Sequence, residues 1–298
     1  MAPPSVTAFE RRRGMVEECL LRFLDPGVCR MPEKLREAVE YSLAAGGKRV
    51  RPVVLLSAGS AVGGDERELL PFACAIEYVH TYSLIHDDLP AMDDDDFRRG
   101  KPSSHKAFGE AAAILAGDAL LTEAFRVMGE SPLAAKEPGR AIAAMAALAR
   151  AAGAEGMVGG QQLDLLAEGK EAVLSEKEEI DLRKTSALLS AAARMGGILG
   201  GGEEARVENL ARYGRALGLL FQVTDDILDE TGSFEEMGKG VAKDRARGKL
   251  TYPAAFGMKT ALARAEALSA EAMSALSSFG EEGDALRDIV RIVAARRS

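Results

Sequence analysis

Two aspartate clusters, each at the end of an apolar stretch with helical spacing, constrain this chain more than any other feature. Residues 87–93 read DDLPAMD and residues 225–229 read DDILD. Ionised carboxylates are almost never buried without a partner, and crowded aspartates repel one another unless a cation neutralises them. Mg²⁺ is usually held by a few carboxylates together with substrate phosphates. The clusters therefore predict two walls of one Mg²⁺–phosphate site.

The spacing within each cluster supports this interpretation. Asp225 and Asp229 are four residues apart, so on a helix both carboxylates project from one face. Asp87 and Asp93 are six apart and would diverge on a regular helix, but Pro90 lies between them and breaks or kinks a helix. We therefore predict a bulge that returns Asp93 to the side of Asp87. A solvated acidic face would not explain the apolar stretches, and the first cluster lacks the alternating pattern of a Ca²⁺-binding EF-hand.

The whole chain is compatible with one domain. It has 298 residues, of which 47% are hydrophobic and 28% charged, with no linker-like tract and no repeat. We predict a single domain over residues 1–298, in which residues 1–14 form a poorly ordered N-terminal extension. The net charge of −8 argues against binding to nucleic acid, which requires a basic surface.

The cysteines and the N-terminus indicate the compartment. Cys19, Cys29 and Cys74 show no metal-ligand spacing, and their odd number gives no disulfide framework, so we expect small core residues in a reducing cytosol. The first residues contain no apolar signal core, and no run approaches the length of a membrane span. These features predict a cytoplasmic protein without stable membrane association.

Helical patterns cover nearly the whole chain, and convincing alternating strands are absent, which predicts an all-α fold. Possible capping boxes, Asp65 with Glu68 and Ser175 with Glu178, are expected to open two long helices. The first helix leads to residue 87, and the second runs through residues 184–185 to 196–197. The other helices are predicted at about 32–45, 52–63, 108–128, 138–168, 203–230, 252–278 and 284–296.

Cationic side chains lie beside both clusters, as a phosphate site requires. Arg98 and Arg99 follow the first cluster, and residues 46–52, GGKRVRP, offer a glycine turn, backbone N–H groups near a helix start and cations. Each charge alone is better explained as a surface residue, and residues 46–52 lack the form of a P-loop. The combination with two carboxylate clusters favours diphosphate binding. Further cations follow the second cluster: Lys239, Lys243, Arg245, Arg247 and Lys249.

The adjacent His86 and Asp87 raise the alternative of an all-α metal phosphohydrolase that uses a His-Asp pair. Such a site would need further histidines spread through the helices. His80 and His105 are the only others, and neither explains the second aspartate cluster. His80 lies seven residues before Asp87 and is instead a candidate phosphate contact.

With these motifs assembled, the chain resembles the trans-prenyltransferases of the isoprenoid diphosphate synthase family, and within it the bacterial farnesyl diphosphate synthases. The resemblance covers about residues 30–260. Its motifs occur in one order, which makes chance agreement very improbable. They are residues 46–52, 77–93, 98–102, 116–121, 159–164, 184–185, 221–229 and 238–239.

The resemblance implies a bundle of about ten or more helices around a deep central cavity, and a homodimer. It also implies three Mg²⁺ ions per site, which Mn²⁺ can replace, two held by the first motif and one by the second. In the first motif Asp87 and Asp93 are the implied direct ligands, and Asp88 supports them. In the second, Asp225 is the implied main ligand, with Asp226 and Asp229 nearby. The residues implied to hold the allylic diphosphate are Arg98, Lys184, Lys239 and Lys249. Those implied to hold isopentenyl diphosphate are Gly47, Lys48, Arg51, His80 and Arg99. The groups implied to assist catalysis are Lys184, Thr185 and Gln222.

The activity implied is the condensation of isopentenyl diphosphate with dimethylallyl and geranyl diphosphates to give farnesyl diphosphate and pyrophosphate. In the family, an aromatic residue at the position of Tyr82 accompanies a fifteen-carbon product, and the adjacent Ser83 is too small to stop chain growth by itself. The alternatives are a geranylgeranyl diphosphate synthase and a non-catalytic partner subunit of the same fold. Partner subunits are expected to lose an aspartate motif, whereas both motifs are intact here.

Overall fold

The structure is a computed structural model that describes residues 4–167, 169, 173–231 and 251–296. Within these residues the fold is all-α, as predicted, apart from one short hairpin. The helices of the first half are α1 (Pro4–Leu20), the 3₁₀ turn η1 (Arg22–Leu24), α2 (Glu33–Leu43), α3 (Val50–Ser60), α4 (Glu66–Asp87), α5 (Ser104–Phe108), α6 (Glu110–Gly129), α7 (Pro132–Lys136) and α8 (Pro138–Ala152). The hairpin pairs β1 (Phe97–Arg98) antiparallel with β2 (Lys101–Pro102).

The second half begins with α9 and includes one π-helical segment. Its elements are α9 (Met157–Ala167), α10 (Leu174–Asp181), the π-helical η2 (Leu182–Ser186), α11 (Ala187–Leu199), α12 (Glu204–Thr231), α14 (Tyr252–Phe256), α15 (Met258–Ala275), the 3₁₀ turn η3 (Glu281–Gly283) and α16 (Asp284–Ala295).

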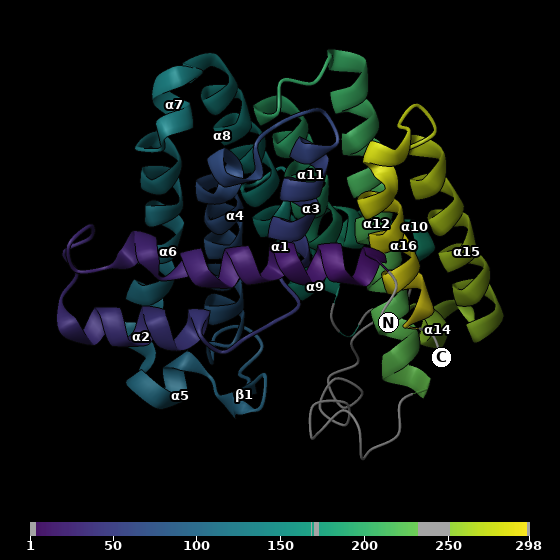
Figure 1. The fold of residues 1–298 in the computed structure, drawn as a ribbon. Coiled ribbons are helices and arrows are strands. Elements are labelled where there is room, and N and C mark those ends of the chain that lie inside the picture. The colour runs from purple at the N-terminus through teal and green to yellow at the C-terminus, as the bar shows by residue number, and fades with distance from the viewer. Residues whose placement is uncertain (1–3, 168, 170–172, 232–250, 297–298) are drawn as a thin grey trace.

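Helix α4 lies at the centre of the bundle. It packs against α3 and α6, while α11 packs against α3, α8 and α12, and α15 covers the outer side of α12. Phe72, Ile76 and Tyr78 of α4 are fully buried, as is Tyr213 of α12. A helix that is apolar on all sides is stable only when other helices surround it. Helices α1 and α2 cross the upright helices, and β1, α5 and α14 lie at one end of the bundle (Figure 1).

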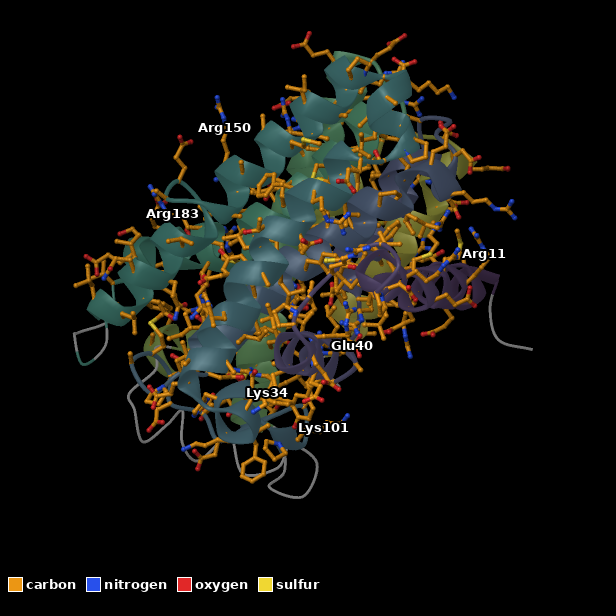
Figure 2. All side chains as sticks on the ribbon, turned by 90° about the vertical axis from the view of Figure 1, so that its left-hand side faces the viewer. Arg11, Lys34, Glu40, Lys101, Arg150 and Arg183 are labelled. Atoms are coloured by element: carbon orange, nitrogen blue, oxygen red, sulfur yellow. The ribbon has the colours of Figure 1, made fainter. Side chains whose placement is uncertain are left out.

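Charged side chains cover the outside of this bundle. Arg11, Lys34, Lys101 and Arg150 are exposed and point away from the helices (Figure 2). The three cysteines are buried and free, which confirms their prediction as core residues.

Several predicted helix boundaries are wrong for local reasons. The predicted helix at 138–168 is two helices separated by a turn at 153–156, and the helix at 252–278 is interrupted at Gly257, which has a φ of +85°. The expected extension at the N-terminus is wrong for residues 8–14, which lie within α1. The second long helix was correctly predicted to run through residues 184–185, although its middle is π-helical.

The two predicted capping boxes do not form as reciprocal pairs. The Asp65 side chain accepts a hydrogen bond from the N–H of Arg67 at 2.9 Å, so it does cap α4, but Glu68 pairs with Lys136 instead of returning to residue 65. Ser175 lies inside α10, which begins at Leu174. The sequence pattern therefore located the N-cap of α4 correctly and missed that of α10, which is Val173, by two residues.

By length and composition, residues 138–167 are the one candidate membrane span in the described part of the chain. The prediction that no apolar run approaches this length is therefore wrong for the sequence of this stretch. The turn at 153–156 nevertheless divides it into helices of 15 and 11 residues, each shorter than the roughly 20 residues that a helical span needs.

The loop between α2 and α3 is fixed to α4 by a buried ion pair. Arg49 has a left-handed backbone conformation (φ 50°), and its guanidinium lies 2.7 Å from Glu77 and 2.7 Å from Glu17. Arg49 is 2% exposed and Glu77 is 1% exposed. Burial opposes the charge of Arg49, but the two carboxylates outweigh it and raise the pKa of the guanidinium. The pair therefore holds residues 46–51 in place beside α4.

Replacing Glu77 by alanine should destabilise the fold by about 3 kcal/mol, because it leaves Arg49 buried with only the more exposed Glu17. The control Glu17→Ala removes the partner that is 40% exposed and should cost about 1 kcal/mol or less. The free energy of unfolding of both variants can be measured by urea titration. An equal or smaller loss for Glu77→Ala would contradict this role of the buried pair.

Candidate active site

Helix α4 ends at the first aspartate cluster, and the chain then folds back on itself. Asp87 is the last residue of α4, and the N–H of Asp93 donates to the carbonyl of Asp87 at 2.8 Å. The N–H of Asp94 donates to the carbonyl of Leu89 at 3.0 Å, and Asp94 has a left-handed φ of 44°. The predicted return of Asp93 towards Asp87 is confirmed, but tight turns after the helix produce it, and not a bulge within a continuing helix.

The Asp87 carboxyl group is placed where its charge is disfavoured. Burial, with a further contribution from Asp93 and Asp88, raises the pKa of Asp87 to about 6, although Lys184 and Arg98 oppose the shift. A partly buried carboxylate beside other carboxylates gains most from a cation. The oxygen-only donor set of the first motif therefore fits Mg²⁺.

Asp88 has a different environment. It is 2% exposed, and its carboxylate accepts two hydrogen bonds from the guanidinium of Arg98, one of them from Nε at 2.9 Å. Asp95 lies 3.7 Å from the same guanidinium. Asp88 therefore fixes Arg98, which agrees with a supporting role for Asp88 and positions Arg98 beside the first motif.

The second cluster occupies the C-terminal part of α12. Burial raises the pKa of Asp225, against the opposing influence of Arg296 and Lys48, and Asp225 lies 2.8 Å from the guanidinium of Arg296. No sequence motif marks Arg296, because its contact with Asp225 depends on the packing of α16 against α12. Asp229 is exposed one turn further along α12.

Asp226 is bonded by the protein itself. It is 4% exposed, accepts from Gln222 Nε2 at 2.8 Å and from the N–H of Tyr252 at 2.9 Å, and pairs with Lys177 at 3.3 Å. Lys177 also pairs with Asp181 at 2.5 Å. These contacts satisfy both carboxylate oxygens and make Asp226 a poorer candidate for direct metal binding than Asp225. Lys177 and Asp181 carried no recognisable motif in the sequence.

The π-helical segment η2 packs against α9 and α12. It carries Lys184, whose ammonium group lies 2.5 Å from Asp164 of α9, and Thr185, whose hydroxyl donates to Gln222 Oε1 at 2.9 Å. A Cβ atom on Gly160 would lie 2.3 Å from the backbone nitrogen of Lys184, so glycine is required for α9 to approach this closely. Such π-helical turns occur frequently at functional sites. The structure thus brings together the three predicted catalytic groups, Lys184, Thr185 and Gln222.

The loop at residues 46–51 approaches the hairpin that follows the first cluster. Arg99, with a left-handed φ of 54°, donates a hydrogen bond to the carbonyl of Gly46. A Cβ atom on Gly47 would lie 2.7 Å from the Arg99 guanidinium carbon, and the φ of Gly47 is +138°. The positive φ favours glycine at residue 47, and the φ of Gly46, +81°, favours it there too, which explains the glycine pair at this position.

Three further predicted phosphate contacts gather nearby. Burial and the adjacent Arg51 and Arg99 lower the pKa of His80 well below its usual value, which favours the neutral imidazole. Burial also lowers the pKa of Arg51, whose Nε is buried with no hydrogen-bond partner among the described residues. The Lys48 ammonium lies 5.4 Å from the centre of the Phe221 ring. A buried positive group with an unused donor is suited to receive an anion.

A cavity of about 560 Å³ extends from these charged groups along α4. Tyr82, which is 7% exposed, lines it, and the Tyr82 and His86 rings meet edge to face with centroids 5.7 Å apart. The amide of Gln161 is also buried in this lining, without a hydrogen-bond partner within the described part of the chain. The polar and charged lining residues include Arg51, His80, Asp87, Lys184 and Thr185, and the rest of the lining includes Tyr82, Ser83, His86, Ile114, Met157 and Val158.

The cavity therefore combines charged groups that suit a diphosphate with a largely apolar lining that suits a hydrocarbon chain. His86, Gln161, Asp164 and Arg296 were not predicted as site residues, although residues 161 and 164 belong to a motif noted in the sequence. The predicted contacts Lys239 and Lys249 lie outside the described residues.

Comparison with known proteins decides the family. The family described as "Polyprenyl synthetase" matches residues 32–292. The chain belongs to this family. The resemblance to the trans-prenyltransferases and the predicted all-α bundle are thereby confirmed.

Individual relatives agree with this membership. The chain is 45% identical to the farnesyl diphosphate synthase of Geobacillus stearothermophilus over 99% of both chains. It is 48% identical to the chloroplastic heterodimeric geranylgeranyl pyrophosphate synthase large subunit 1 of Arabidopsis thaliana, over 89% of this chain and 73% of the plant protein. A solved FPP/GFPP synthase from Zymomonas mobilis superposes with a TM-score of 0.86 at 35% identity, over 99% of this chain and 100% of the other.

Replacing Asp87 by asparagine should lower turnover at least about a thousandfold, which corresponds to about 4 kcal/mol of transition-state stabilisation. Asparagine keeps nearly the same shape but removes the negative charge that the first motif offers to a cation. The measurement is pyrophosphate release at saturating substrates and Mg²⁺. Asp284→Asn, which changes an exposed aspartate at the start of α16, is the control and should keep the wild-type rate. A folded Asp87→Asn protein with a rate within tenfold of wild type would contradict the assignment.

Proposed function

We propose that the protein is a farnesyl diphosphate synthase, which adds isopentenyl diphosphate first to dimethylallyl diphosphate and then to geranyl diphosphate. The observation that carries the proposal is the position of Tyr82. Its ring lines the apolar cavity five residues, or about 7.5 Å along the helix axis, before Asp87 on α4. A prenyl chain whose diphosphate lies at Asp87 would extend along this helix and meet the ring.

The proposed metal ligands are Asp87, Asp93, Asp225 and Asp229, with Asp88 and Asp226 in support. The family generally uses Mg²⁺, and we propose three ions per site, with Mn²⁺ as a substitute. When bound, the ions would neutralise the charge of the departing diphosphate. The chain itself would hold this group with Lys184 and Arg98, which Asp164 and Asp88 respectively orient.

The residues around the cavity support the remaining steps. Arg51, Lys48, His80, Arg99 and the backbone at Gly47 would hold isopentenyl diphosphate. The hydroxyl of Thr185 and the amide of Gln222, fixed to each other, would stabilise the allylic cation as oriented dipoles. The double bond of isopentenyl diphosphate then attacks this cation, and the released pyrophosphate is the proposed acceptor of the proton that leaves.

Two alternatives remain from the sequence. The first is a geranylgeranyl diphosphate synthase, which is what several plant relatives are named. The ring of Tyr82 in the cavity instead favours the fifteen-carbon product. A non-catalytic partner subunit is disfavoured because the first aspartate motif, the second motif and the π segment are all present. The homodimer and the cytoplasmic location stay predictions.

Replacing Tyr82 by alanine should shift the main product from fifteen to twenty carbons or longer, because the ring no longer blocks the cavity. Products can be identified by mass spectrometry after dephosphorylation. The control Tyr82→Phe keeps the ring and should keep the fifteen-carbon product. The proposal fails if the wild type already makes mainly twenty-carbon product, and the role of Tyr82 fails if the alanine variant still stops at fifteen.

Replacing Lys48 or Arg51 by glutamine should raise the KM for isopentenyl diphosphate more than the KM for geranyl diphosphate, by roughly tenfold per lost charged hydrogen bond. The two constants are measured by varying one substrate at saturating levels of the other. Lys184→Gln is the matched comparison and should act mainly on the allylic substrate. Equal increases for both substrates in all three variants would show a general electrostatic effect and no separate binding sites.

A further inference from the structure

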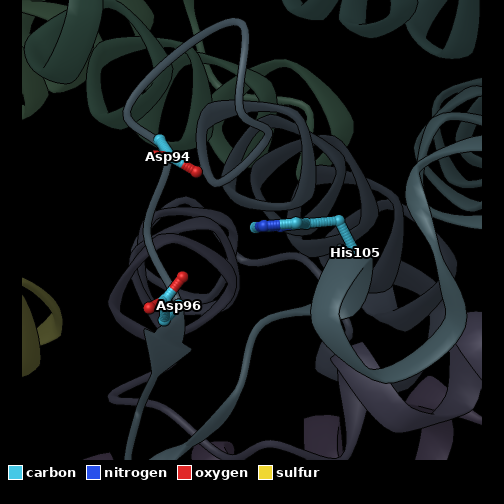
Figure 3. Close-up of side chains that lie close together, drawn as sticks. All are labelled: Asp94, Asp96 and His105. Carbon is cyan, nitrogen blue, oxygen red and sulfur yellow. The ribbon is translucent and has the colours of Figure 1, made fainter.

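A second group of potential metal ligands lies just beyond the first aspartate motif. Asp94 and Asp96 belong to the loop between α4 and β1, and His105 belongs to α5. Each offers one ligand atom, and the three atoms lie within 4.8 Å of one another (Figure 3). Exposed aspartates alone would be no more than a solvated acidic loop, so the histidine decides whether the group is a site.

His105 is buried, and its two ring nitrogens have different surroundings. The residue is 6% exposed, and its Nε2 has no hydrogen-bond partner among the residues that the structure describes. Its imidazole points between the two aspartates (Figure 3). A buried polar atom left unpaired costs about 1–3 kcal/mol, so such an atom calls for a ligand.

The other nitrogen of the ring is already engaged. Nδ1 of His105 lies 3.1 Å from the hydroxyl oxygen of Ser103, which is also buried. When Nδ1–H donates to this oxygen, the lone pair of Nε2 is directed at the aspartates. Histidines that bind metals are typically oriented in this way, by a hydrogen bond from the second ring nitrogen.

We propose that Asp94, Asp96 and His105 bind a divalent transition-metal ion of the Zn²⁺ class, at a site separate from the catalytic aspartates. One imidazole and two carboxylates suit Zn²⁺ and its neighbours in the first transition row better than Mg²⁺, which prefers oxygen ligands alone. Three protein ligands leave coordination positions for water.

Lys106 neutralises part of this group in the absence of an ion. Its ammonium lies 2.9 Å from Asp96, and hydrogen bonding to Asp96, together with the charges of Asp96 and Asp94, raises the pKa of Lys106. Lys106 is exposed, so its side chain can move into solvent when an ion binds. The lysine therefore competes with the metal, and its removal should strengthen binding.

The ion would fasten the loop after α4 to α5. The N–H of Ser103 already donates to the carbonyl of Asp96 at 2.9 Å, and the hairpin between these two residues carries Arg98 and Arg99. A metal bridge across the base of this hairpin would stiffen it. This effect is separate from the proposed catalytic use of Mg²⁺, and its test needs no turnover.

The test titrates full-length, chelator-treated protein with Co²⁺, without any diphosphate, and follows the visible absorption of the bound ion; Zn²⁺ binding is measured by calorimetry. We expect binding of one equivalent in the wild type. His105→Gln and Asp96→Asn should each weaken it at least about tenfold, whereas Lys106→Gln should strengthen it. The double variant Asp87→Asn/Asp93→Asn is the control for the catalytic motif and should bind as the wild type does.

Three results would overturn the proposal: no Co²⁺ binding to the wild type at millimolar concentration, unchanged binding in His105→Gln and Asp96→Asn, or loss of binding only in the Asp87→Asn/Asp93→Asn variant. Circular dichroism checks that each variant is folded. If His105→Gln does not fold, the other two variants still test the proposal. A metal site predicts weaker Co²⁺ binding in Asp96→Asn and tighter Co²⁺ binding in Lys106→Gln. A purely structural role for the loop would not make Lys106→Gln bind Co²⁺ more tightly.

Discussion

The placement of like charges inside a largely apolar bundle is the constraint on which this site depends. Three aspartates of the two motifs are each paired with a cation, and each cation comes from a different element. Arg98 compensates Asp88, Lys177 compensates Asp226, and Arg296 compensates Asp225. Because breaking a buried pair by losing one partner costs several kcal/mol, these contacts also fix the elements that carry them.

The contact between Arg296 and Asp225 differs from the other two in its exposure. The Arg296 side chain is 23% exposed and that of Asp225 is 34% exposed, whereas Asp88 and Asp226 are nearly inaccessible. A partly exposed pair is weaker and can be exchanged for another cation at lower cost. Arg296 therefore balances Asp225 through a contact that a competing cation can replace at lower cost than the two buried pairs.

Local sequence patterns predicted the parts of the fold that depend on local interactions. The all-α class, α12 and the end of α4 near Asp87 follow from helical spacing and from Pro90. The predicted helix at 138–168 failed because its apolar pattern continues across a turn at 153–156, where two glycines, Gly153 and Gly156, allow the chain to change direction. Apolar spacing shows which face is buried, but it does not show where a helix stops.

Contacts between distant segments could not be predicted in the same way. Arg296 reaches Asp225 only because α16 packs on α12, and Lys177 reaches Asp226 only because α10 lies against α12. Each of these residues looks like an ordinary surface charge in the sequence. The motifs point to the residues that substrates are proposed to touch, because such residues need particular chemical groups at fixed spacing. An orienting partner can come from any neighbouring element.

The double aspartates that begin both clusters illustrate this division. Neighbouring residues on a helix point about 100° apart, so only one of each pair can face the cavity. Asp87 lines the cavity, whereas Asp88 turns away and binds Arg98. Asp225 pairs with Arg296 and lies within the electrostatic influence of Lys48. Asp226 turns towards Lys177 and the start of α14. Asp226 also accepts from Gln222, which in turn accepts from Thr185. The second aspartate of each pair therefore positions polar groups of the site, and the first is the one proposed as a metal ligand.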